Sequence, residues 1–226
     1  MEIKFYGLQK TTLLDYPGYV ACILFTCGCN MRCPFCHNQS LVYPDLFPEE
    51  INVLDFLEKR RGILDGVVIS GGEPLLYDTE ETLSRIKEMG YKIKLDTNGT
   101  SPDKLEYLIH EGLVDYVAMD IKHAPDKYKL ATGVETNIDN IRRSIDILLN
   151  GSIEYEFRTT VVCGIHTEED LVELAGWIQG AKRYYLQQYR ETNSNHVLSA
   201  FTDEEMKNMV KKIRTIIPHT GLRGVE

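Results

Sequence analysis

Residues 66–74 read Gly-Val-Val-Ile-Ser-Gly-Gly-Glu-Pro, and they display the unit from which the chain is built. A β-branched run is followed by a turn rich in glycine and proline, and then by a helical pattern at Thr79–Met89. Short apolar runs bounded by turn residues are typical of buried strands, and helical spacing of apolar residues indicates a helix. We therefore predict a strand, a turn and a helix in this order.

The same unit recurs along the chain. Strands are predicted at Val20–Thr26, Gly66–Ser70, Tyr91–Leu95, Tyr116–Ile121, Ile153–Val162 and Tyr184–Tyr189. Helices are predicted at Pro48–Arg61, at Thr79–Met89, from Ser101 onward, and at Ile138–Leu149, Thr167–Ile178 and Thr202–Ile216. Alternating strands and helices predict a parallel sheet that is covered by helices.

Six such units predict an α/β fold in the form of an open, partial (β/α)6 barrel with parallel strands, because eight units would close a barrel. A flat doubly wound sheet is the competing arrangement. We expect a single domain over residues 1–226, with a hairpin or lid at 1–19, the six units at 20–190, and a C-terminal helix and tail at 191–226.

The composition excludes several classes of protein. Hydrophobic residues make up 43% and charged residues 26%, as in an ordinary folded protein. The formal net charge of −9 leaves no excess of Lys and Arg for a phosphate backbone, so we expect no nucleic-acid partner. No run reaches the ~18 apolar residues of a membrane helix, and the first residues lack a signal-peptide pattern. We expect a cytoplasmic protein with no membrane partner.

The chain has six cysteines, and four of them follow the first predicted strand at Cys27, Cys29, Cys33 and Cys36. In a reducing compartment such a group indicates metal binding rather than disulfides. Cys29, Cys33 and Cys36 have the spacing C-x3-C-x2-C, and three thiolates can hold three irons of a four-iron cluster while the fourth stays open. A structural zinc site that also uses Cys27 is the alternative.

Glycines and charged residues follow the other predicted strands at their carboxyl ends, where parallel α/β folds bind ligands. They are Gly71, Gly72, Glu73, Asp96, Asp120 and Lys122; Arg158 is counted with them, although it stands mid-run in its predicted strand. Glycine lets backbone approach a ligand, and a carboxylate such as Glu73 accepts from an ammonium group. Buried acids need compensating charge, which Lys122 can supply. The alternative is that these residues have only structural roles. The glycines and acids would then form turns and caps at strand ends, and Arg158 would pair with Glu156 or Asp120.

The stretch Cys29-Asn-Met-Arg-Cys33-Pro-Phe-Cys36-His-Asn38 resembles the signature of the radical S-adenosylmethionine (radical SAM) superfamily, in particular its glycyl-radical-enzyme activating branch. The likeness continues at residues 8–11, 15–18, 70–74, 95–99, 119–122 and 157–160, and it covers nearly the whole chain. Among named groups, the chain most resembles the anaerobic ribonucleoside-triphosphate reductase activating proteins in their longer form, with pyruvate formate-lyase activating enzymes as relatives.

This resemblance implies one four-iron, four-sulfur (4Fe-4S) cluster on Cys29, Cys33 and Cys36, with S-adenosylmethionine (SAM) bound to the open iron. It implies reductive cleavage of SAM to a 5′-deoxyadenosyl radical, which takes a hydrogen from a glycine Cα of a partner enzyme. The implied partner is anaerobic ribonucleotide reductase, and the implied electron donor is a flavodoxin or ferredoxin.

The resemblance also implies which residues contact SAM: Asn38, Gly71, Gly72, Glu73, Asp96, Asn98, Asp120, Lys122 and Arg158. In pyruvate formate-lyase activating enzymes the residues that match Asp96, Thr97 and Asp120 help hold a monovalent cation, so we expect a similar site here.

Three cysteines lie outside this ligand set. Cys27 stands where relatives usually have glutamine, so the sequence leaves its role open. Cys22 and Cys163 border apolar runs, and we expect both to be structural thiols. Two other functions stay open as well: a radical SAM enzyme that acts on a small molecule or another peptide, and a non-catalytic zinc or iron-sulfur adaptor.

Overall fold

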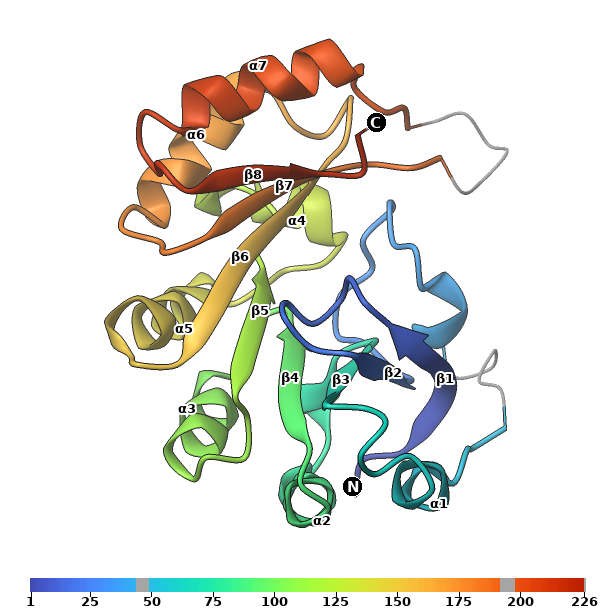
Figure 1. Cartoon of the computed structure of the whole chain (residues 1–226). Helices are drawn as coiled ribbons and strands as arrows, with labels where there is room; N and C mark the ends of the chain where they lie inside the picture. Colours follow the sequence, from blue (N-terminus) through green and yellow to red (C-terminus); the bar gives the residue numbers. More distant parts are fainter. Residues whose placement is uncertain (44–48, 192–197, 226) are drawn as a thin grey trace. The chain divides into compact units, whose positions relative to one another are not determined.

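The structure is a computed structural model that describes residues 1–43, 49–191 and 198–225. Its strands in these ranges are β1 (Phe5–Thr12), β2 (Ala21–Thr26), β3 (Gly66–Gly71), β4 (Lys92–Thr97), β5 (Tyr116–Asp120), β6 (Glu154–Val161), β7 (Tyr184–Gln188) and β8 (Thr220–Arg223). They form one sheet in the order β1-β2-β3-β4-β5-β6-β7-β8 (Figure 1). The sheet is mostly parallel, which confirms the predicted α/β fold class.

Helices follow most of these strands. They are α1 (Val53–Glu58), α2 (Glu80–Glu88), α3 (Pro102–His110), α4 (Tyr128–Thr132), α5 (Ile138–Asn150), α6 (Glu168–Trp177) and α7 (Asp203–Ile213). Short 3-10 helices lie at Gln39–Leu41, Pro74–Leu76 and Pro125–Lys127. No helix within the described ranges has the length and apolar character needed to cross a membrane.

The N-caps explain where several helices begin. Thr167 and Thr202 each close a capping box, in which the threonine side chain accepts from the third backbone N–H of α6 or α7. Asn137 accepts in the same way from the first residues of α5. These polar residues stand directly before an apolar periodic run, which is why the sequence located the three helices closely.

The sheet has eight strands where the repeated units predicted six. The two additional strands lie at its ends: β1 pairs antiparallel with β2, and β8 pairs parallel with β7. Both are polar at several positions and β8 has four residues, so neither shows a clear apolar pattern. The tail predicted for 191–226 therefore contains a strand as well as α7. The predicted helix start at Pro48 lies outside the described residues.

The chain divides into two compact units. The N-terminal unit consists of Met1–Asn30, Asn38–Thr97 and Ser101–Ala118, and the C-terminal unit of Met31–His37, Asn98–Thr100 and Met119–Glu226. The single domain expected over 1–226 stays a prediction.

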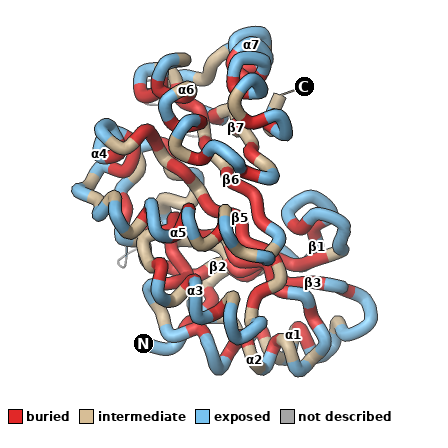
Figure 2. Tube along the Cα trace, turned by 90° about the vertical axis from the view of Figure 1, so that its left-hand side faces the viewer, coloured by how far each residue is buried: buried red, intermediate tan, exposed pale blue. Residues whose placement is uncertain are grey.

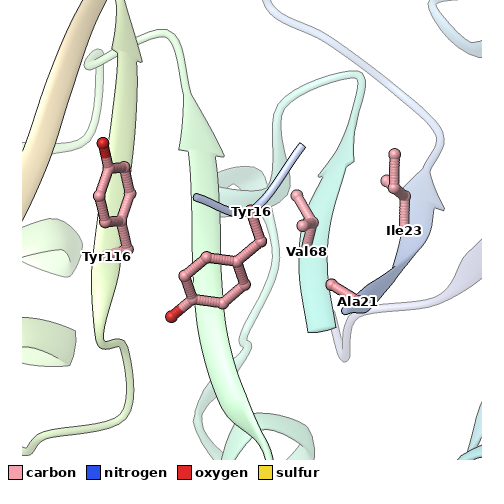
Figure 3. Packing of buried hydrophobic residues seen from close by; sticks show 5 residues of the cluster. All are labelled: Tyr16, Ala21, Ile23, Val68 and Tyr116. Carbon is pink, nitrogen blue, oxygen red and sulfur yellow. The ribbon is translucent and has the colours of Figure 1, made fainter. Parts of the chain in front are cut away.

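In the N-terminal unit, β2, β3 and β4 pair in parallel with a continuous register, from Ala21 opposite Gly66 to Thr26 opposite Gly71. A core cluster of Tyr16, Ala21, Ile23, Val68 and Tyr116 packs on these strands (Figure 3). Tyr16 lies over Gly66, where an added Cβ would stand 2.8 Å from its ring. The Asp-Tyr-Pro-Gly stretch at 15–18 thus has a packing role at the beginning of β3.

In the C-terminal unit, β6, β7 and β8 pair in parallel, and α7 packs on α6 and on β8 (Figure 1). Buried residues follow the strands, and exposed residues follow the outer faces of the helices (Figure 2). Arg223 on β8 makes a bidentate ion pair with buried Glu156 on β6, at 2.7 and 2.9 Å, and its guanidinium stacks on Tyr185. This ion pair stabilises the position of β8 in the sheet.

Candidate active site

The N-terminal unit carries the beginning of the cysteine loop directly after β2. The Tyr77 hydroxyl donates to the Cys27 carbonyl at 2.6 Å, and the Gly28 N–H donates to the Leu41 carbonyl at 2.6 Å. These contacts fix the backbone just before Cys29, the first predicted ligand.

Gly71 and Gly72 lie against this same backbone. A Cβ at Gly71 would stand 2.3 Å from the Thr26 carbonyl oxygen, and one at Gly72 would stand 1.9 Å from the Gly28 carbonyl oxygen. Gly71 also has φ +118°, which side chains disfavour. The two glycines therefore let the end of β3 pack on the backbone that leads to Cys29. Their predicted contact with SAM stays a prediction.

Glu73 and Asn38 both make hydrogen bonds that stabilise the turn after β3. Glu73 is buried, and its Oε1 accepts from the Leu75 N–H at 3.1 Å and from the Thr97 hydroxyl at 2.8 Å. The Asn38 amide donates to the Gly71 carbonyl at 3.2 Å. Both predicted SAM contacts thus have a local role in joining the turn after β3 to β4 and to the segment that follows Cys36.

Asp96 lies at the end of β4 between two donors. Its Oδ2 accepts from the Ser70 hydroxyl at 3.1 Å, and its Oδ1 pairs with the ammonium of Lys94, two residues earlier on the same strand. Lys94 was not among the residues that the sequence pattern singled out.

The C-terminal unit carries the rest of the cysteine loop, residues 31–37. The Arg32 N–H donates to the Thr132 carbonyl at 2.7 Å, and the Cys36 N–H donates to the Cys33 carbonyl at 3.1 Å. Gly133 ends α4 with φ +71°, and a Cβ there would stand 2.5 Å from the Arg32 carbonyl oxygen. The end of α4 is therefore the support on which this loop lies.

Phe35, between the second and third predicted ligands, anchors the loop in a hydrophobic core. It is buried in a cluster whose other members are Ala131, Val162, Ile165 and Tyr189, with partly buried Cys33 and Leu198 packed against it. Burying a phenylalanine side chain stabilises by about 2–3 kcal/mol. The apolar residue of the Cys-Pro-Phe-Cys stretch thus anchors the loop that carries Cys33 and Cys36.

Asp120 at the end of β5, Lys122 just after it and Arg158 in the middle of β6 form a connected group. Arg158 Nε donates to Asp120 Oδ1 at 2.9 Å, and Lys122 Nζ donates to Oδ2 at 3.1 Å. Burial acts to raise the pKa of Asp120, but the two cations outweigh it and lower this pKa to about 2. The group holds two positive charges for one negative charge, which suits an anionic ligand.

The backbone of Lys122 is held by buried aromatic side chains. His166 Nδ1 accepts from the Val162 N–H, so its Nε2 carries the proton and donates to the Lys122 carbonyl at 2.9 Å. The Lys122 N–H donates to the Tyr128 hydroxyl at 3.3 Å. The His166 ring stacks on His123 at 4.9 Å. Burial lowers the pKa of His166 to about 4, so the ring is neutral at physiological pH.

Asn98 closes the turn after β4. Its Oδ1 accepts from the Thr100 N–H at 3.0 Å and from the Thr100 hydroxyl at 2.7 Å, which is an Asx turn. The Ser144 hydroxyl donates to the Gly99 carbonyl at 2.7 Å, so α5 supports this turn. The predicted SAM contact of Asn98 stays a prediction.

The thiols fall into two groups by exposure. All six are thiols outside disulfides; Cys29, Cys33, Cys36 and Cys163 are partly exposed, whereas Cys22 and Cys27 are fully buried. Burial raises the pKa of Cys27 to about 11 and that of Cys22 to about 12, so both remain protonated. The buried position of Cys27 favours the three-cysteine ligand set over a four-cysteine zinc site. Cys22 is buried as expected, and Cys163 is more exposed than expected.

The structure brings part of the predicted site together in each unit. Cys29 belongs to the N-terminal unit, whereas Cys33 and Cys36 belong to the C-terminal unit. Over the described ranges, no group of three or more His, Cys, Asp or Glu side chains is already assembled around a metal position. The donor set nevertheless fits an iron-sulfur cluster in chemistry, because it consists of three partly exposed thiols on one loop.

Comparison with known proteins identifies the family. The model of the radical SAM superfamily matches residues 23–178. The chain belongs to the radical SAM superfamily. It is 35% identical over 213 residues to a candidate glycyl-radical enzyme activating enzyme of Methanocaldococcus jannaschii, covering 90% of this chain and 84% of that protein. It is 24% identical to the pyruvate formate-lyase-activating enzyme of Clostridium pasteurianum, covering 95% and 98% of the two chains.

Two solved structures have a similar fold. SuiB of Streptococcus suis, solved with bound S-adenosylmethionine, aligns with a TM-score of 0.67 and 15% identity over 89% of this chain and 52% of that chain. A domain of a pyruvate-formate lyase-activating enzyme from Bacteroides vulgatus aligns with a TM-score of 0.54 and 17% identity, covering 70% of this chain and 99% of that domain.

Membership in this superfamily makes the chain an enzyme of radical chemistry that uses a 4Fe-4S cluster and SAM. The functional residues that sequence reasoning missed are mostly supports: Lys94, Phe35, Thr132, Gly133 and His166. Phe35 gave a signal, since it is an apolar residue inside a polar metal-binding motif. Lys94 gave another, because it interrupts an apolar strand.

Proposed function

We propose that this chain activates a glycyl-radical enzyme by abstracting hydrogen from a glycine Cα of that partner. The observation that carries the proposal is the near full-length match to activating enzymes, together with the C-x3-C-x2-C loop. The chain also matches a candidate GTP 3′,8-cyclase of Thermococcus kodakarensis at 31% identity, but over only 68% of this chain and 52% of that protein. The activating enzymes therefore account for more of the chain.

Cys29, Cys33 and Cys36 would hold the cluster through their thiolates. When bound, the cluster and SAM supply a 5′-deoxyadenosyl radical, the species that takes the hydrogen atom. The loop must keep its three thiols oriented, and in the C-terminal unit Phe35 and the Arg32 contact with Thr132 do this for Cys33 and Cys36.

Lys122 and Arg158 would provide the charge that receives the SAM carboxylate. Asp120 aligns both cations, and because it stays ionised the group keeps one net positive charge. Asn38, Gly71, Gly72, Glu73, Asp96 and Asn98 complete the proposed SAM contacts. The resemblance also implies a monovalent cation at Asp96, Thr97 and Asp120, but the ammonium of Lys94 already pairs with Asp96.

The proposed partner is anaerobic ribonucleotide reductase, with a reduced flavodoxin or ferredoxin as electron donor. The sequence resemblance to the activating proteins of this reductase supports the choice. The substrate is then a glycine in a protein loop rather than a free metabolite.

Electron paramagnetic resonance tests the proposal. The reconstituted chain is mixed anaerobically with SAM, reductant and the reductase, and a glycyl-radical doublet is expected on the reductase. A reductase in which the acceptor glycine is replaced by alanine serves as control and should give no doublet. SAM cleavage with no doublet would contradict the activase function and favour a small-molecule or peptide substrate.

A further inference from the structure

Lys94 is a buried charge at the centre of β4. Its side chain is only 2% exposed, and its register partner on β3 is Val68, a member of the core cluster shown in Figure 3. A lysine in such surroundings is unfavourable unless its ammonium is paired and hydrogen-bonded. The position therefore calls for a specific anionic partner.

That partner is Asp96. Side chains alternate along a strand, so residues 94 and 96 project from the same face of β4. The Lys94 ammonium pairs with Asp96 Oδ1, while the Ser70 hydroxyl donates to Oδ2 at 3.1 Å. Both carboxylate oxygens thus have donors from β3 and β4, and the Asp96 side chain is 16% exposed.

Thr97 projects from the opposite face of the same strand. Its hydroxyl donates to buried Glu73 at 2.8 Å. The side-chain oxygens of Asp96 and Thr97 are therefore used on two different faces. The positive charge that compensates the Asp96 carboxylate comes from Lys94, which lies on β4 itself.

We propose that the Lys94 ammonium takes the place of a monovalent metal ion at Asp96. It supplies a permanent positive charge at the carboxyl end of β4, so the carboxylate is held ionised and oriented without a bound sodium or potassium ion. Lys94 is a positioning residue in this proposal, because it acts through Asp96.

Removing the ammonium while keeping the apolar stem should expose this role. In Lys94→Met, Asp96 is a largely covered carboxylate without its counter-charge, and a small cation can bind in the space that the ammonium left. We expect wild-type protein to unfold at the same temperature in choline, sodium and potassium chloride of equal ionic strength. Lys94→Met should unfold at a lower temperature in choline and regain roughly 3–6 °C in sodium or potassium chloride.

Two variants serve as controls. Lys92→Met removes a half-exposed lysine from the same strand, and it should show no difference between the three salts. Lys94→Met/Asp96→Asn removes both charges, so its unfolding temperature should again be independent of the cation. The double variant also separates specific binding from general effects of each salt on protein stability.

The unfolding temperature needs no partner enzyme, so the result is independent of whether the chain generates a glycyl radical. A wild-type protein that sodium or potassium stabilises over choline would overturn the proposal. So would a Lys94→Met protein that behaves alike in all three salts or stays unfolded in each of them.

Discussion

Arg158 on β6 donates through Nε to Asp120 Oδ1 at the end of β5, at 2.9 Å, and Lys122 donates to the other carboxylate oxygen. The backbone reinforces the pairing, because the Ile121 N–H donates to the Arg158 carbonyl at 2.8 Å. Asp120 therefore fixes two cations whose combined charge exceeds its own. This surplus is what a carboxylate ligand such as SAM requires.

Lys122→Met should weaken SAM binding by roughly 10–100-fold, since a charge-assisted hydrogen bond is worth about 1.5–3 kcal/mol. Isothermal titration of the cluster-loaded chain with SAM measures the effect. Lys129→Met is the matched control, because that lysine is exposed and pairs with exposed Glu135. Equal dissociation constants for Lys122→Met and wild type would remove Lys122 from the SAM site.

Gly72→Ala should disturb the cysteine loop. The added methyl would meet the Gly28 carbonyl at 1.9 Å, so the backbone before Cys29 must move. We expect a loss of about 1–3 kcal/mol in stability and a lower iron content after reconstitution. Gly176→Ala in α6 is the control, since nothing lies within 4 Å of its Cβ position. Normal iron content in Gly72→Ala would show that the close contact is unimportant.

Phe35→Ala should loosen Cys33 and Cys36 by removing their anchor. Deleting a buried phenylalanine side chain costs about 3–5 kcal/mol. The cluster of this variant should be lost to a chelator faster than that of wild type, as followed by its visible absorbance. Phe35→Leu keeps most of the apolar volume and should lie close to wild type. Equal rates of loss in Phe35→Ala and wild type would contradict the anchoring role.

Stability should fall as the pH is lowered from about 6.5 toward 4. Burial lowers the pKa of His166 from 6.5 to about 4, so in this range the unfolded chain binds a proton that the folded chain does not. The difference amounts to roughly 3 kcal/mol at the acid end. Urea unfolding at several pH values measures the slope.

His166→Gln should flatten this pH dependence, because glutamine keeps a donor for the Lys122 carbonyl but does not titrate. His110→Gln is the control, since that ring is largely exposed. Asp120 contributes little to the change in stability between pH 6.5 and 4. Arg158 and Lys122 hold its pKa below the ordinary 3.8 against the effect of burial, so the stability that the ionised Asp120 provides is lost only at lower pH. An unchanged slope in His166→Gln would assign the pH dependence to other groups.

Much of the fold could be predicted because most inner strands contain a compact apolar run followed by a turn. Gly66–Gly71 and Tyr116–Asp120 lie where the pattern placed them, to within about a residue. The edge strands could not be found in this way, since β8 is short and relies on Arg223 pairing with distant Glu156. Such a contact has no local signature.

The candidate site likewise contains residues that the sequence could predict and residues that it could not. Cysteine spacing and strand-end residues mark chemistry, and Asp120, Lys122 and Arg158 do lie together. The supports depend on tertiary contacts, so Gly133 under the cysteine loop could not be inferred from its neighbours in sequence. Gly72 shows a related limit, because its role in packing on Gly28 becomes visible only once β2 and β3 are side by side.

Anaerobic cleavage of SAM by single cysteine variants tests most directly whether Cys29, Cys33 and Cys36 form the catalytic centre. Wild type and Cys27→Ser should bind iron and, with reductant, convert SAM to methionine and 5′-deoxyadenosine. Replacing Cys29, Cys33 or Cys36 by alanine should abolish 5′-deoxyadenosine formation. Retained cleavage in any of these three variants, or its loss in Cys27→Ser with normal folding, would contradict the three-cysteine assignment.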